Sequence, residues 1–223
     1  MALLKGTKNK DRLVGTAAGD VINGLDGNDT LIGGGGDDKV RAGAGNDFVR
    51  GGAGADQLFG DAGSDRVFGD SGDDVIDGGR DNDVLVGGSG NDTIRGGAGV
   101  DTTTFSGALA TYAISITGSG YSVARVSYTD QVAKDVEILR FGDRSIDLRL
   151  PTFTTRADSL EVGEDSFSTI NVLANDASKF VTLSASNITA FTQGSKGSVT
   201  NNGDGTFTYT ANADATGSDS FTY

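Results

Sequence analysis

The chain of 223 residues lacks cysteine, histidine and tryptophan altogether, and it has one proline and one methionine. Without cysteine or histidine it has no disulfide bonds, no Cys- or His-ligated zinc and no Cys/His or Ser/His catalysis. Positive charge is also scarce, since 18 Lys and Arg stand against 31 Asp and Glu, which gives a net charge of −13. This acidity disfavours nucleic acids and anionic membrane surfaces as partners and favours cations.

Long apolar runs are missing as well. No stretch approaches the roughly 18–20 apolar residues that span a bilayer. The N-terminal segment MALLKG has too short an apolar run for a secretory signal. We therefore expect no membrane insertion, and we expect that any export depends on another signal.

What the chain has in abundance is glycine, and 26 of its 36 glycines lie between residues 6 and 104. Written in lines of nine, such as GGAGADQLF and GDAGSDRVF, these residues align without a gap. The first position is Gly in ten of the eleven lines, the fourth is Gly in eight, and the eighth is Leu, Ile or Val in ten. The sixth position is aspartate throughout: Asp11, Asp20, Asp29, Asp38, Asp47, Asp56, Asp65, Asp74, Asp83, Asp92 and Asp101.

Glycine-rich stretches of six residues suit tight turns, and the three residues that follow suit a short strand with one inward side chain. Two such units form a coil of 18 residues, and successive coils of a parallel stack lie about 4.8 Å apart. Repeats n and n+2 are therefore expected to lie directly above one another. A flexible acidic linker would need neither the fixed phase nor the regular aliphatic residue.

One aliphatic side chain in nine residues is little apolar burial for a glycine-rich chain, and columns of carboxylates repel one another. The chain alone is therefore expected to fold poorly. Ca²⁺ takes 6–8 oxygen ligands from carboxylates and carbonyls, whereas Mg²⁺ holds its waters and fits less well. An ion shared by the aspartates of repeats n and n+2 allows up to nine sites in eleven repeats.

The repeat resembles the G-G-x-G-x-D-x-U-x nonapeptide of the RTX (repeats in toxin) family, a calcium-binding parallel β-helix. The resemblance implies ligation by the sixth-position aspartates and by main-chain carbonyls of positions one to four. Those carbonyls belong to Gly24, Gly27, Gly33, Gly34, Gly36, Gly43, Gly45, Gly51, Gly52, Gly54, Gly60, Gly63, Gly69, Gly72, Gly78, Gly79, Gly87, Gly88 and Gly90. It also implies type I secretion. The first two repeats carry Thr7 and Thr16 in place of glycine, so the central repeats are expected to bind best.

Residues 105–150 lose the nonapeptide phase. The stretches YAISITGSGYSVARVSY and DVEILRFGDRSIDL predict two pairs of strands around glycine turns. This segment resembles the β-rich region that often follows RTX repeats, and we expect it to cap the open end of the stack. A catalytic role for Glu137 or Asp143 is the less favoured interpretation.

Residues 151–223, which begin at the single proline, alternate polar and apolar residues between turn signals. This predicts a β-sandwich, and words such as VLAND and NGDGTFTYT resemble cadherin-like or immunoglobulin-like repeats. The sequence stops inside what reads as a last strand, so we expect a truncated domain or a fragment. The acids of this segment are either ordinary exposed side chains or ligands of a further calcium ion: Asp158, Glu164, Asp165 and Asp176.

Outward positions of the odd-numbered repeats are more apolar than those of the even-numbered repeats, and they include Phe48 and Phe68. A contiguous apolar patch is usually covered. We expect another part of the protein or a partner to pack there, against the alternative of singly exposed apolar residues.

The sequence thus predicts an all-β protein: a parallel β-roll over 6–104, a β-rich cap over 105–150 and a β-sandwich over 151–223. The favoured function is a calcium-binding structural or adhesion module of a secreted or cell-surface bacterial protein, folding outside the cell. Its expected partners are calcium ions and an extracellular polysaccharide or cell-surface protein. The alternative is a non-catalytic secretion and folding accessory of a larger enzyme, because these residues carry no metalloprotease helix and no nucleophile elbow.

Overall fold

The computed structural model describes residues 1–149, 153–154, 156–178, 188 and 190–223. Two compact units make up the chain, Met1–Leu150 and Pro151–Tyr223. Pro151, where composition changes, lies outside the described residues. The described residues contain β-strands and one short 3₁₀ helix but no α-helix, so the all-β prediction is confirmed.

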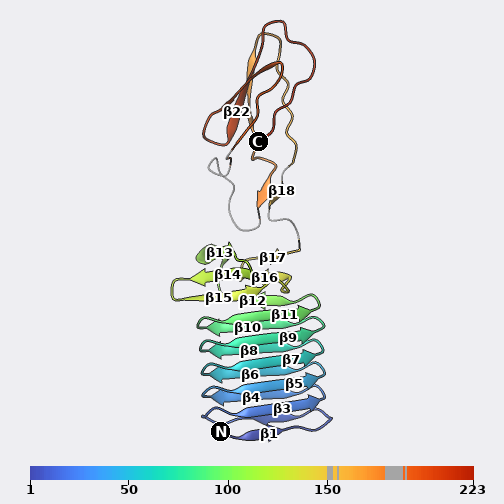
Figure 1. Ribbon diagram of the computed structural model, residues 1–223, viewed down its shortest axis with the longest axis vertical. Helices are drawn as coiled ribbons and strands as arrows, with labels where there is room; N and C mark the ends of the chain where they lie inside the picture. Colours follow the sequence, from blue (N-terminus) through green and yellow to red (C-terminus); the bar gives the residue numbers. More distant parts are fainter. Residues whose placement is uncertain (150–152, 155, 179–187, 189) are drawn as a thin grey trace. The chain divides into compact units, whose positions relative to one another are not determined.

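The first unit is a parallel β-solenoid whose strands alternate between two sheets (Figure 1). One sheet contains β1 (Leu3–Lys5), β3 (Val21–Asp26), β5 (Lys39–Ala44), β7 (Gln57–Ala62), β9 (Val75–Arg80) and β11 (Thr93–Ala98). The other contains β2 (Arg12–Val14), β4 (Thr30–Gly35), β6 (Phe48–Ala53), β8 (Arg66–Ser71), β10 (Val84–Ser89) and β12 (Thr102–Thr104). The predicted β-roll is confirmed.

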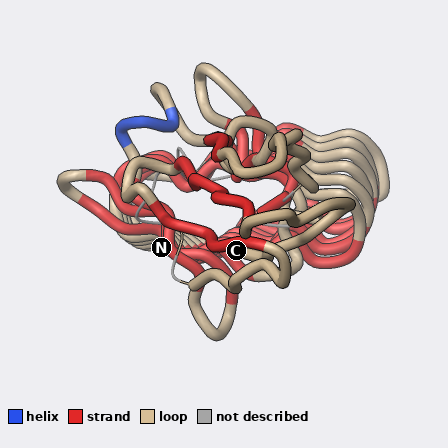
Figure 2. The backbone as a smooth tube through the Cα atoms, turned by 90° about the horizontal axis from the view of Figure 1, so that it is seen from above, coloured by secondary structure: helices blue, strands red, loops and turns tan. Residues whose placement is uncertain are grey.

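Each strand pairs with the strand 18 residues away. Leu31 lies opposite Val49 and Ile76 opposite Ile94. Repeats n and n+2 therefore stack as the nine-residue period predicts, and the loops of successive coils superimpose in the view along the stack (Figure 2). Odd-numbered and even-numbered repeats build separate sheets, as expected.

The strands are longer than the three residues predicted, because most contain six. They continue through the first three positions of the next repeat, and Gly52, with a φ of 116°, is still paired with Gly34. A left-handed residue at the second position bends the strand without ending its pairing, so the turn shrinks to positions four to six. Strand β1 adds a half-repeat before residue 6, with Leu4 opposite Ile22.

The interior of the roll is a double ladder of eighth-position aliphatic side chains, each at most 1% exposed. Its members are Ile22, Leu31, Val40, Val49, Leu58, Val67, Ile76, Leu85 and Ile94. Leu4 and Leu13 pack against this core from its N-terminal end and are partly buried. The core is one side chain wide in each sheet, as the sequence indicates.

The C-terminal end of the roll is covered by residues 105–149. This cap contains η1 (Leu109–Thr111), β13 (Ala113–Ile116), β14 (Gly120–Arg125), β15 (Tyr128–Ala133), β16 (Ile138–Arg140) and β17 (Ser145–Asp147). The two predicted hairpin turns are present between β13 and β14 and between β16 and β17. Strand β15 was not predicted, and with β16 it continues the two parallel sheets of the roll.

The second unit has two antiparallel sheets in its described part. One contains β19 (Phe167–Asn171), β21 (Gly197–Asn201) and β22 (Thr206–Ala211), and the other pairs β18 (Phe153–Thr154) with β20 (Ala177–Ser178). Its core is formed by Val172, Val199 and Phe207. The prediction that this unit is rich in β-structure is confirmed.

Candidate calcium sites

The sixth-position aspartates form two buried columns, one on each side of the roll. From Asp20 to Asp101 every one of them is at most 3% exposed. From Asp11 to Asp83, each backbone amide of the column donates a hydrogen bond to Oδ1 of the aspartate 18 residues later, as from Asp47 to Asp65 at 2.7 Å. The structure therefore brings together the n and n+2 aspartates that the sequence predicts.

The second carboxylate oxygen of nine of these aspartates is buried without any hydrogen-bond partner. The nine oxygens are Oδ2 of Asp29, Asp38, Asp47, Asp56, Asp65, Asp74, Asp83, Asp92 and Asp101. A buried charged oxygen without a donor is strongly unfavourable. Nine such atoms in register within two columns fit sites for a cation.

Glycine at the first position allows these oxygens to lie where the Cβ of any other residue would be. A Cβ on Gly60 would lie closer than 3.0 Å to Oδ2 of Asp65 in its own repeat and to the carbonyl oxygen of Gly78, two repeats later. The same two-sided crowding recurs at Gly33 and Gly69. The place of a side chain is thus taken by two oxygens from adjacent coils.

Carbonyl oxygens of neighbouring turn positions point in opposite directions along the stack. The first-position carbonyl of Gly78 faces Gly60 in the preceding coil, whereas the second-position carbonyl of Gly34 faces Gly52 in the following coil. One turn can therefore offer oxygens to cations on both sides. Carboxylates and carbonyls converging in this way fit the all-oxygen ligation that Ca²⁺ requires.

Carboxylate clusters alone do not make these sites, because no group of three or more acidic side chains in the described part of the chain could hold a metal ion. Ligation would combine the column aspartates with the turn carbonyls. Ala42, the one first-position exception, is fully buried, and Oδ2 of Asp47 in the same repeat is still without a hydrogen-bond partner.

Burial raises the pKa of the interior aspartates, and the neighbouring carboxylates of each column add to the effect. The pKa reaches about 8 at Asp65 and about 7 at Asp74 and Asp83. At Asp47 and Asp56 it is raised to about 6. The fold therefore resists ionisation of these groups unless a cation compensates the charge.

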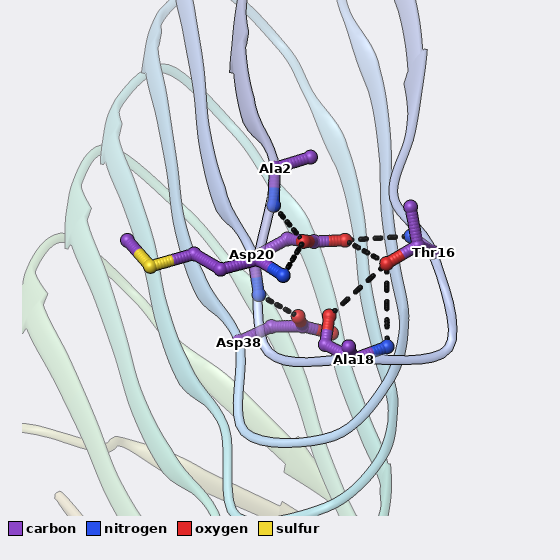
Figure 3. A network of polar contacts seen from close by, with 6 residues as sticks. Ala2, Thr16, Ala18, Asp20 and Asp38 are labelled. Carbon is purple, nitrogen blue, oxygen red and sulfur yellow. Dashed lines mark hydrogen bonds and ion pairs between the residues drawn. The ribbon is translucent and has the colours of Figure 1, made fainter.

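The first two repeats differ, because threonine replaces the second-position glycine. Oδ2 of Asp20 accepts hydrogen bonds from the amide of Thr16 at 2.6 Å and from its hydroxyl at 2.8 Å (Figure 3). The amide and the hydroxyl of Thr7 donate hydrogen bonds to Oδ2 of Asp11 in the same way. The amide of Ala2, followed by Thr16, holds the pKa of Asp20 below its ordinary value. These two aspartates are satisfied by the protein itself.

The fifth position carries a second ladder that sequence reasoning missed. Oδ1 of Asn46 accepts a hydrogen bond from the amide of Ser64, and Oδ1 of Asp73 accepts one from Asn91. Here each amide donates to a side chain of the preceding coil, whereas in the sixth-position column each amide donates to a side chain of the following coil. The frequent Asn and Asp at this position was the available signal.

Three acids outside the sixth position also have structural places in the roll. Asp61 and Asp70 stand at second positions with φ of 70° and 77°, and they pair with Arg41 and Arg50. Asp81, at a fourth position, has φ of 73°. Aspartate tolerates this left-handed geometry better than most residues.

Two carboxylates of the cap also join the columns. The amide of Asp92 donates to Oδ1 of Asp130 at 3.1 Å, and the amide of Asp101 donates to Oε2 of Glu137 at 2.8 Å. Each acid precedes a buried aliphatic residue by two positions, as in the repeat, and this spacing was the signal missed. Asp143 instead accepts a hydrogen bond from the amide of Leu109 at 2.8 Å, a structural contact.

In the second unit the structure brings together two of the four acids considered. Oδ2 of Asp158 and Oδ2 of Asp176 lie 2.9 Å and 3.1 Å from the Tyr223 hydroxyl. Glu164 and Asp165 are exposed, and Asp165 lies beside the amide of Asp214. A further calcium site made of all four acids therefore does not form.

On the more apolar face of the roll, the rings of Phe48 and Phe68 pack on each other at 5.3 Å and are both half-buried. The idea that a partner covers this face stays a prediction. No helix in the described ranges is long and apolar enough to cross a membrane.

Comparison with protein families gives two matches. Residues 6–40, 32–67, 41–76 and 68–103 each match the RTX calcium-binding nonapeptide repeat. Residues 149–223 match the bacterial Ig domain. A comparison with curated proteins gives no match.

Proposed function

Since residues 6–103 are RTX calcium-binding nonapeptide repeats and residues 149–223 are a bacterial Ig domain, we propose that the chain is a calcium-dependent structural and adhesion module. It belongs to a secreted or surface-attached bacterial protein and folds when it meets calcium outside the cell. The observation that carries this proposal is the pair of columns of nine buried carboxylate oxygens without partners.

Calcium would supply the positive charge that each of these oxygens lacks. The column aspartates and the first-, second- and fourth-position carbonyls are the groups that would hold it. Because the sites exist only when adjacent coils are stacked, the binding free energy adds directly to the free energy of folding. The roll would then be unfolded where calcium is scarce and folded where it is abundant.

This dependence suits export of an unfolded chain. Extracellular calcium modules bind with dissociation constants of about 10⁻⁴–10⁻³ M, so low cytosolic calcium leaves them empty. A chain without disulfides can pass a secretion channel unfolded, and we propose the type I route on the strength of the repeat family. Folding outside the cell would then prevent its return.

The Ig domain favours an adhesion role over the role of a folding accessory for an enzyme. Such a domain serves as a spacer or contact module for an extracellular polysaccharide or a cell-surface protein. The acidic surface of the chain, with its net charge of −13, directs it away from anionic partners unless calcium bridges the two.

The test is a calcium titration of the full chain followed by circular dichroism in the far ultraviolet. Strand signal from the roll should appear with calcium, disappear with a chelator and fail to appear with magnesium. In Asp56→Ala the calcium midpoint should rise severalfold, because Asp56 belongs to two stacked rungs. Asp26→Ala, which removes an exposed acid outside the columns, is the matched control. A strand signal independent of calcium would refute the proposal.

A further inference from the structure

The last coil of the roll is built from residues outside the nonapeptide repeats. Strand β15 pairs in parallel with β11, with Thr93 opposite Gln131, and β16 pairs in parallel with β12, with Thr102 opposite Ile138. Val132 and Leu139 occupy the core positions and are 2% and 0% exposed. The solenoid therefore continues past residue 103, where the family match ends.

Asp130 and Glu137 hold the place of sixth-position aspartates in this coil. The carboxylates of Asp130 and Glu137 accept hydrogen bonds from the backbone amides of Asp92 and Asp101, respectively. In the repeats, Asp101 accepts a hydrogen bond from the Asp83 amide in the same way, at 2.9 Å. The residue after each acid also donates as in a repeat. Gln131 donates to the Asp92 carbonyl at 2.7 Å and Ile138 to the Asp101 carbonyl at 3.0 Å.

The carboxylates facing this coil have the same unsatisfied oxygens as the interior rungs. Oδ2 of Asp92 and Oδ2 of Asp101 are buried without a partner, and the two side chains belong to residues 1% and 0% exposed. Asp130 is itself only 2% exposed. No lysine or arginine is paired with either aspartate among the described ion pairs of the chain.

A backbone carbonyl completes the resemblance at the Asp101 end. A Cβ on Gly96 would lie 2.5 Å from Oδ2 of Asp101 and 2.5 Å from the carbonyl oxygen of Asp135. At Gly78 the equivalent oxygens come from Asp83 and from the first-position carbonyl of Gly96. Asp135 also accepts the Gly96 amide on its Oδ1 at 3.2 Å. Asp135 thus provides the carbonyl oxygen that the first-position residue of a following repeat would provide.

We propose that Asp92 with Asp130, and Asp101 with Glu137, hold two further calcium ions at the C-terminal end of the columns. The proposal rests on calcium binding by the roll, and it assigns ligands that the repeat motif does not include. Glutamate suits such a site because its carboxylate reaches further and serves as a Ca²⁺ ligand in other proteins. Folding of the cap is then coupled to calcium.

The two ends of the roll differ in consequence. At the N-terminal end Ala2 stands where the next aspartate of the column would be, and threonines satisfy Asp11 and Asp20. At the C-terminal end the two columns of carboxylates continue for one more coil. There the free oxygens of Asp92 and Asp101 accept no hydrogen bond from a hydroxyl group. The N-terminal end is closed by the protein and the C-terminal end by cations.

The test compares the number of calcium ions bound by the full chain and by D130N/E137Q, measured by equilibrium dialysis at saturating calcium. Amide oxygens can still accept the bonds from Asp92 and Asp101, so the variant should keep its strand signal and bind two ions fewer. D147N, in the neighbouring strand β17, is the matched control and should bind the wild-type number. An unchanged number in D130N/E137Q would mean that both carboxylates are hydrogen-bond acceptors only, and would overturn the proposal.

If the double variant does not fold, the single variant E137Q should bind one ion fewer than wild type, and an equal number would overturn the proposal. If wild-type protein neither binds calcium nor folds with it, the proposed function fails instead. If wild-type protein binds and folds but the variants bind as many ions, only the present proposal fails. The two failures are therefore distinguishable.

Terbium luminescence provides a second readout. Residues 6–104 contain neither tyrosine nor tryptophan, whereas Tyr128 is two residues from Asp130. Terbium bound beside β15 should emit on tyrosine excitation, and D130N should abolish that emission while D65N leaves it. Tyr128→Phe should also remove it. Emission that survives both D130N and Tyr128→Phe would come from another tyrosine and would count against the proposal.

Discussion

The roll and the second unit are both made of β-strands, but they treat their carboxylates in opposite ways. Nine column aspartates of the roll bury an oxygen without a donor. Asp219 of the second unit accepts hydrogen bonds from the amides of Ser195 and Lys196 at 2.8 Å and 2.7 Å, and from the Tyr209 hydroxyl at 2.8 Å. The first arrangement leaves buried carboxylate oxygens that a cation could compensate, and the second is satisfied by hydrogen bonds within the protein.

The hydrophobic cores of the roll and of the second unit also differ. Apart from the cap, the interior of the roll is a ladder of single aliphatic side chains, with no aromatic ring among them. In the second unit Phe207 is fully buried, and the rings of Phe191 and Phe221 lie 5.2 Å and 5.5 Å from it. A clustered aromatic core stabilises its unit by apolar burial. A glycine-rich ladder of single side chains buries much less apolar surface.

The largest expected difference between the units is their response to calcium removal. With excess chelator, amides of residues 12–104 should lose protection from hydrogen exchange, while those of β19, β21 and β22 should keep it. The reason is that only the roll depends on cations for its buried charges. Hydrogen exchange with mass spectrometry resolves the two regions. Protected roll amides in the chelator would contradict the comparison.

Phe207→Ala should have the complementary effect. Removal of a fully buried phenylalanine costs about 3–5 kcal/mol, so the second unit should unfold at a much lower temperature while the calcium midpoint of the roll stays unchanged. Calorimetry in calcium should resolve the two transitions. Phe167→Ala, at a side chain 71% exposed, is the control and should change little. A shifted calcium midpoint would show that the two units are coupled.

Acidification should shift the stability of the two units in opposite directions. In chelator the roll should gain stability as pH falls from about 8 to about 4. The pKa of Asp65, Asp74 and Asp83 is raised in the fold, so these groups take up protons that the unfolded chain does not. The second unit should lose stability below about pH 4, where protonation of Asp219 removes the effect of its lowered pKa.

Circular dichroism in the chelator at several pH values would show whether the strand signal of the roll returns on acidification, and denaturant titrations would measure the stability of the second unit. In calcium the sign for the roll reverses, because protons compete with the ion for the same carboxylates. Calcium affinity should therefore fall as pH drops below about 8. A roll that becomes less stable on acidification in the chelator would show that its carboxylates find donors in solution.

The smallest expected effect lies within the roll. Asp65→Asn should raise the calcium midpoint severalfold, because it removes a charge from an interior rung. Asp20→Asn should leave the midpoint nearly unchanged, because it perturbs the hydrogen bonds from Thr16 and removes no charge from an interior rung. Calcium titrations of the two variants side by side measure the difference. Equal midpoints would contradict a self-satisfied N-terminal end.

Sequence reasoning was strongest where the chain repeats itself. The aspartate columns, the aliphatic ladders of the core and the stacking of repeats n and n+2 all follow from a period of nine residues. It was weaker at strand ends, because a glycine such as Gly52 with φ of 116° reads as a turn and yet stays paired. The composition of single positions did not reveal the ladder of Asn46 and Asp73, whose amide partners lie 18 residues away.

By itself the sequence determined the period and the position of every column aspartate, because each is a local pattern repeated at fixed spacing. Only the tertiary structure decided how the two ends of the columns are closed. Asp92 meets Asp130 across 38 residues and Asp101 meets Glu137 across 36, outside the nine-residue phase. The spacing of each acid to its aliphatic residue marks Asp130 and Glu137 locally, but the tertiary structure decides which strands add to the sheets after the repeat has ended.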